Sequence, residues 1–120
     1  GLTDEQLDLI YTREDRTEEG PFTVRRLIHR ITTHHCDHLR HLLKARQGLG
    51  KPRGEVSRAL AEMQAARAEV IASLVGLEDE DLDREWAPGE FTVRKILLHM
   101  VEMEQMRLAH IRQALASPVS

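Results

Sequence analysis

Aromatic residues, cysteine and long apolar runs are scarce in this sequence. Aromatic side chains make up 3% of it, so apolar contacts must come from aliphatic residues and methionine, a composition that favours helices over sheets. The single cysteine, Cys36, excludes an internal disulfide and predicts a reducing, cytoplasmic location. No apolar run approaches the roughly 20 residues that span a bilayer. We therefore expect no membrane partner.

Positive charge is not in excess either. The formal net charge is -3, from 17 Lys and Arg against 20 Asp and Glu. A dedicated nucleic-acid binder normally carries a basic patch or a surplus of cations. We therefore expect no nucleic-acid partner. The 41% hydrophobic and 31% charged residues are typical of a globular chain.

Three long segments carry apolar residues at helical spacing, about 23–47, 55–75 and 92–116. Thr23 and Thr92 are the expected N-caps of the first and third segments. Strict alternation of apolar and polar residues, which indicates strands, is missing. The sequence thus predicts an all-α fold of three long helices.

Shorter elements precede two of these helices. Acidic stretches over residues 3–10 and 77–84 predict short helices, the first with Thr3 as its N-cap. A polar loop is expected over residues 12–21. Neither the short helices nor the loop adds a predicted strand.

An internal repeat is the strongest sign of organisation. Residues 22–27, Phe-Thr-Val-Arg-Arg-Leu, recur as residues 91–96, Phe-Thr-Val-Arg-Lys-Ile, and the acidic stretch 1–8 is mirrored by 76–83 in the same order. Two blocks matched in the same order indicate a repeated structural unit.

We expect a single helical-bundle domain over residues 1–120, built from repeat units 1–47 and 54–116. The second unit includes the long helix 55–75 before its acidic stretch, whereas the first has no such helix. A four-helix bundle therefore lacks one helix in this chain. Homodimerisation, with a partner chain completing the bundle, or an N-terminal segment that precedes this sequence, would supply it.

Histidines gather in the first long helix. His34 and His38 are one turn apart on one helix face, and such a pair can place two imidazole nitrogens about 2.0–2.1 Å from one ion. The same segment contains five of the chain's seven histidines, namely His29, His34, His35, His38 and His41.

Other interpretations of these histidines stay open. His35 with His38 is a rival pair, and His41 lies on the same flank, where it could support a ligand by hydrogen bonding. His29 and His110 are expected to face solvent. An i, i+4 histidine pair is also common on ordinary solvated helices, so the spacing by itself does not decide for a metal.

His99 occupies the matching flank of the last helix. If the two Phe-Thr-Val-Arg helices pack about a pseudo-twofold axis, His99 could face His34 and His38. Three imidazoles would leave a position open for water, substrate or a thiolate.

Two strings resemble the DinB/YfiT-like superfamily: residues 86–99, Trp-Ala-Pro-Gly-Glu-Phe-Thr-Val-Arg-Lys-Ile-Leu-Leu-His, and residues 34–41, His-His-Cys-Asp-His-Leu-Arg-His. The resemblance implies a four-helix bundle that holds a divalent metal (zinc, nickel or iron) on three histidines. By that pattern the ligands are His99, from the Trp-Pro-Gly helix, with His34 and His38. The two halves stand in inverted order relative to the family, so the chain is either permuted or truncated, with a helix lost or exchanged.

The resemblance also implies a class of activity. Related proteins include metal-dependent thiol S-transferases, which use low-molecular-weight thiols, and hydrolase-like enzymes. A small-molecule thiol or an electrophile is then the expected substrate. The alternative is a non-catalytic helical-bundle module for interaction or dimerisation.

Overall fold

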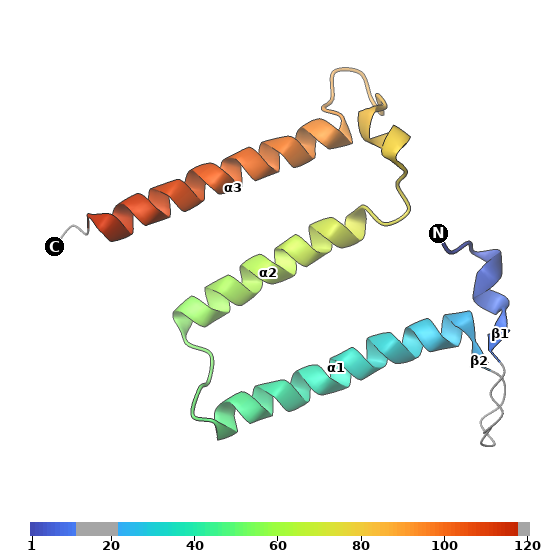
Figure 1. The fold of residues 1–120 in the computed structure, drawn as a ribbon, viewed down its shortest axis with the longest axis horizontal. Coiled ribbons are helices and arrows are strands. Elements are labelled where there is room, and N and C mark those ends of the chain that lie inside the picture. The colour runs from blue at the N-terminus through green and yellow to red at the C-terminus, as the bar shows by residue number, and fades with distance from the viewer. Residues whose placement is uncertain (12–21, 118–120) are drawn as a thin grey trace. The chain divides into compact units, whose positions relative to one another are not determined.

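The computed structural model describes residues 1–11 and 22–117 (Figure 1). The polar loop expected over residues 12–21 lies outside the described residues. In chain order the elements are the 3-10 helix η1 (Glu5–Asp8), strands β1 (Ile10–Tyr11) and β2 (Phe22–Thr23), helices α1 (Val24–Gly48) and α2 (Glu55–Ser73), the 3-10 helix η2 (Asp79–Asp83) and helix α3 (Val93–Ala116).

The described part of the chain is mostly helical, which confirms the all-α class. The three long helices begin and end within two residues of the predicted positions. The chain divides into two compact units, Gly1–Glu62 and Met63–Ser120, with the division inside α2. They are called here the N-terminal unit and the C-terminal unit, and each is described by itself.

Both predicted threonine caps are present. Thr23 and Thr92 have extended backbone, and the Oγ1 atom of each accepts a hydrogen bond from a backbone N–H three residues later, at 3.2 Å in both cases. The donors are Arg26 and Lys95. Each cap satisfies a backbone donor that the first turn leaves without a helical partner, which fixes where α1 and α3 begin.

The end of α1 is equally well defined. The Lys51 N–H donates to the Arg46 carbonyl at 2.8 Å, and the Gly50 N–H donates to the Gln47 carbonyl at 3.0 Å. Gly50 has a φ of 69°, a left-handed conformation that glycine adopts without steric cost. This pattern is a Schellman motif, which stops the helix and turns the chain.

A short β-ladder in the N-terminal unit was not anticipated from the sequence. β1 and β2 are antiparallel, with Ile10 opposite Thr23 and Tyr11 opposite Phe22. Each strand has two residues, too few for alternation to be visible. The ladder leads directly into the cap of α1.

The two acidic stretches form 3-10 helices. The cap position of η1 is Asp4, so the prediction of Thr3 as the N-cap was wrong. The backbone N–H of Thr3 donates to the Gln6 side chain at 2.9 Å. η2 begins with a reciprocal capping box between Glu78 and Asp81.

Apolar side chains of the long helices are more exposed than the sequence suggested. None of the described residues is buried, and the exposed fractions of Leu42 and Ile111 are 64% and 55%. Among the described residues, no helix is long and apolar enough to cross a membrane.

Candidate metal centre

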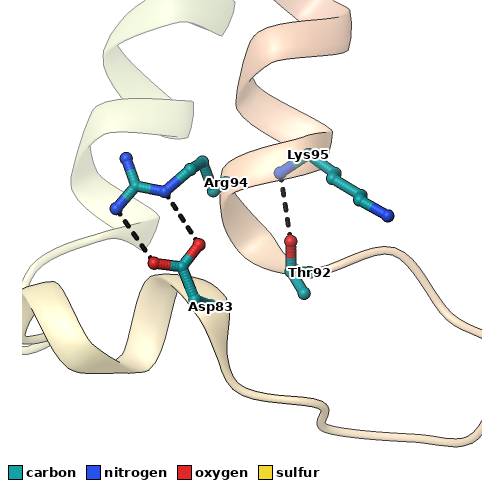
Figure 2. Close-up of polar contacts among 4 residues, drawn as sticks. All are labelled: Asp83, Thr92, Arg94 and Lys95. Atoms are coloured by element: carbon teal, nitrogen blue, oxygen red, sulfur yellow. Dashed lines mark hydrogen bonds and ion pairs between the residues drawn. The ribbon is translucent and has the colours of Figure 1, made fainter.

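The two long helices that carry the candidate ligands begin in the same local frame. In the second repeat unit, Arg94 of α3 donates to Asp83 of η2 from Nε at 2.8 Å and from a terminal nitrogen at 3.2 Å (Figure 2). In the first, Arg25 of α1 forms an ion pair with Asp8 of η1. Each acidic 3-10 turn is thereby tied to the first turn of its helix.

This frame perturbs its own ionisable groups. The side-chain hydrogen bond from Arg94 lowers the pKa of Asp83, and the same contact raises the pKa of Arg94. The pKa of Asp81 is lowered first by the backbone N–H of Glu78 and then by the side chain of Arg84. The carboxylates of Asp81 and Asp83 are therefore held in the charged form to lower pH than usual.

Within the N-terminal unit, the candidate ligands His34 and His38 lie side by side. Their ring centroids are 4.4 Å apart with an interplanar angle of 66°, as the i, i+4 spacing predicts. His41 continues this row, with its centroid 5.8 Å from that of His38. All three side chains are exposed.

The rival pair of His35 and His38 stays open, and one backbone contact bears on it. His35 Nδ1 lies 2.8 Å from the Ile31 carbonyl oxygen, and because a carbonyl can only accept, that nitrogen must carry the proton. Nε2 of His35 is then free to bind an ion, which is the usual arrangement of a metal-ligating histidine. No such backbone contact engages His34 or His38 within the described residues.

His99 belongs to the C-terminal unit, where it lines a groove between α2 and α3 with a volume of about 810 Å³. The other walls are mainly apolar and include Met63, Met100 and Met103. An ion pair between Arg67 of α2 and Glu104 of α3 spans the groove. His99 is thus an imidazole at the edge of an apolar surface.

The sequence analysis did not identify this groove. Its signal was present in the spacing of Met100 and Met103, which lie one turn apart on α3, and in that of Met63 and Val70, which lie two turns apart on α2. Periodicity shows that such residues share a face. It does not show that two faces border one groove.

The repeat places all three candidate ligands on one flank of the repeated helix. When residues 22–27 are aligned with 91–96, Arg30, His34 and His38 of α1 correspond to His99, Met103 and Arg107 of α3. In the C-terminal unit this flank borders the groove. The flank of α1 with His34 and His38 is therefore the one expected to border a neighbouring helix.

Among residues 1–11 and 22–117, no three His, Cys, Asp or Glu side chains form a group able to hold a metal ion. His34 and His38 lie in the N-terminal unit and His99 in the C-terminal unit. The structure therefore brings together two of the three predicted ligands, and the complete set of three stays a prediction.

Comparison of the chain with protein-family models, curated proteins and solved structures gives no match. The class of protein therefore rests on the helical fold, the histidines and the two strings at residues 34–41 and 86–99.

Proposed function

We propose that this chain is a DinB-like helical-bundle protein that binds a divalent metal ion, zinc, nickel or iron, through His34, His38 and His99. The observation that carries the proposal is the adjacency of His34 and His38, whose ring centroids are 4.4 Å apart on one face of α1. Three imidazoles are a ligand set that first-row divalent ions accept.

Two further observations support the choice of His99 as the third ligand. It lies on the flank of α3 that corresponds to the flank of α1 with His34 and His38, and it borders an apolar groove. An apolar surrounding raises the strength of electrostatic contacts to a bound ion. The third imidazole is supplied by the same chain or by the second chain of a homodimer.

The proposed activity is transfer of a small-molecule thiol to an electrophile, or a related hydrolysis. A bound divalent ion supplies the means of lowering the pKa of a thiol, so that the thiolate is available at neutral pH. In this proposal His34, His38 and His99 hold the ion, and the methionines of the groove provide an apolar wall for the substrate.

The test is the metal content of the purified chain. We expect near-stoichiometric zinc, nickel or iron in the native protein, and a metal affinity lowered by more than about a hundredfold in His34→Ala, His38→Ala and His99→Ala, because a lost ligand costs more than a lost supporting hydrogen bond.

Matched controls come from the repeat and from the other histidines. Arg30→Ala and Met103→Ala alter the positions that correspond to His99 and His34, and His29→Ala removes a histidine outside the set; all three should keep their metal. Equal metal loss in His29→Ala, or metal-free native protein after addition of each ion, would overturn the proposal.

The alternative function is a non-catalytic interaction module. The observation that favours it is the exposure of apolar side chains on all three long helices, among them Ile31 at 60%, Leu60 at 54% and Ile111 at 55%. Large exposed apolar surfaces mark interaction sites. Metal-free protein that forms a stable dimer in solution, with a mass unchanged by His34→Ala, would support this function over the first.

A further inference from the structure

The charge of this chain is unevenly distributed, although the net charge is negative. Every charged residue between Asp37 and Glu55 is a cation. These residues lie on the last turns of α1 and on the connection to α2. They are called here the basic elbow and comprise Arg40, Lys44, Arg46, Lys51 and Arg53.

The cations of the basic elbow are not neutralised locally. All five side chains are exposed, and none forms an ion pair with another residue in the described ranges. By contrast, Arg25, Arg67 and Arg94 each have a carboxylate partner. Uncompensated charges of one sign on a single segment create a local positive potential.

The helix that the two repeat units share forms without these cations. Arg40, Lys44 and Arg46 of α1 correspond to Ala109, Gln113 and Leu115 of α3, and α3 is a helix of nearly the same length. The positive charge is therefore a property of the first repeat unit and not of the fold that the two units share.

An exposed leucine stands at the centre of the basic elbow. Leu49 is the C-cap of α1 and is 75% exposed. Its position is fixed by the Schellman motif, in which Arg46 on one side and Lys51 on the other form the closing hydrogen bond at 2.8 Å. The chain thus presents an apolar side chain between two cations at the end of a helix.

We propose that the basic elbow docks the protein onto an anionic lipid surface, with Leu49 entering the headgroup region. Clusters of four or more Lys and Arg beside an apolar side chain are suited to phosphatidylserine-containing bilayers. Nucleic acid fits less well, since the segment from Arg40 to Arg53 has no Phe, Tyr or Trp on which bases could stack. This proposal departs from the expectation of no membrane partner, which rested on the lack of an apolar run long enough to span a bilayer. Docking at a lipid surface needs no such run.

Sedimentation of the full-length chain with lipid vesicles tests the proposal. We expect binding to vesicles of phosphatidylcholine with phosphatidylserine, little binding to phosphatidylcholine alone, and weakening with added salt. Because each cation near an anionic surface changes partitioning by about fivefold, Lys51→Glu with Arg53→Glu should reduce binding by more than about tenfold. Leu49→Ser should also weaken it.

Two matched controls separate the elbow from general effects. Lys95→Glu with Arg112→Glu makes the same change in net charge on α3, and Val75→Ser removes an apolar side chain that is 83% exposed beyond the other end of α2, near η2. Both variants, and His34→Ala, should bind vesicles as the native chain does. Far-ultraviolet circular dichroism checks that each variant remains helical.

Three results would overturn the proposal: no binding to phosphatidylserine vesicles, equal binding to neutral vesicles, or equal weakening by the α3 charge variant. A parallel measurement with duplex DNA covers the other polyanion. Binding to the duplex that depends on Lys51 and Arg53, without binding to vesicles, would make the elbow a nucleic-acid surface instead.

Discussion

The two repeat units differ in what surrounds a common frame. In both, an acidic 3-10 turn precedes a long helix, a threonine caps that helix, and an arginine in the first turn binds an aspartate of the 3-10 turn. The paired residues are Thr23 and Thr92, Arg25 and Arg94, and Asp8 and Asp83. The frame that starts each helix has therefore been kept in both units.

The segments that lead into the frame are built differently. In the first unit, the guanidinium carbons of Arg26 and Arg30 lie 4.6 and 5.1 Å from the centroid of the Phe22 ring. In the second unit, Trp86 Nε1 donates to the carbonyl of Phe91 at 2.8 Å. The residues at the start of the helix are therefore held by cation–π contacts in the first unit and by an indole hydrogen bond in the second.

The corresponding flanks of α1 and α3 differ even more, and so do the side chains that they offer for binding a metal. His34 and His38 in α1 stand where α3 has Met103 and Arg107. The start of the helix is thus a structural requirement, whereas the flank beyond it varies between the two units and carries the candidate ligands. The following predictions test this division, beginning with the largest effect.

Removal of the caps should affect both units alike. Thr23→Ala and Thr92→Ala should each lower the free energy of unfolding by about 1 kcal/mol, because an N–H of the first turn loses its acceptor. Chemical denaturation followed by circular dichroism measures the change, with Thr→Ser at each position as the control that keeps the acceptor. A large loss at one position and none at the other would show that the frames are not equivalent.

A substitution specific to the second unit should have a smaller effect. Trp86→Phe removes the N–H that donates to Phe91 and should cost about 0.5 kcal/mol, since the indole is 60% exposed and water can replace it. Thermal unfolding of the variant beside Trp86→His, which retains a ring N–H donor, measures this contact. A cost above that of Thr92→Ala would mean that the loop, rather than the cap, determines where α3 begins.

The smallest effect is expected from the ion pair of the second unit, and it should depend on pH. The folded pKa of Asp83 is lowered by Arg94, so its stabilisation is present above the unfolded pKa of about 4 and is lost as pH falls through the lower folded pKa. Asp83→Asn should therefore be slightly less stable than the native chain at neutral pH.

In acid, the stability difference between Asp83→Asn and the native chain should vanish, because Asp83 is then neutral in both the folded and the unfolded native chain. Melting temperatures measured from neutral to acidic pH provide the check. Asn in place of Asp8 gives the corresponding variant of the first unit. A difference that persists unchanged in acid would rule out the ion pair as its origin.

The features that were predictable from the sequence are local ones. The bounds of α1 and α3, their threonine caps and the acidic turns depend on hydrogen bonds between residues three or four positions apart, so the pattern of residue types reveals them. The adjacency of His34 and His38 belongs to the same class, since helix geometry alone brings them together.

Features that depend on contacts between distant segments were not predictable. The β1–β2 ladder joins residues more than ten positions apart in the sequence, and the groove in the C-terminal unit requires faces of α2 and α3 to border one another. The proposed site has the same dependence, because His99 is remote in sequence from His34. The net charge is a sum over the whole chain, so it did not reveal the local excess of Lys and Arg in the basic elbow.

The only thiol of the chain gives this protein a ready-made point of attachment for a reporter group. Cys36 is exposed and lies between His34 and His38 along α1, so a nitroxide or a fluorophore can be coupled there without removing any other cysteine. A paramagnetic ion such as Cu²⁺ bound by those imidazoles would broaden or quench the signal of the attached group. Binding of the ion at His34 and His38 can thus be followed in solution by the signal of the attached group, with no other residue changed.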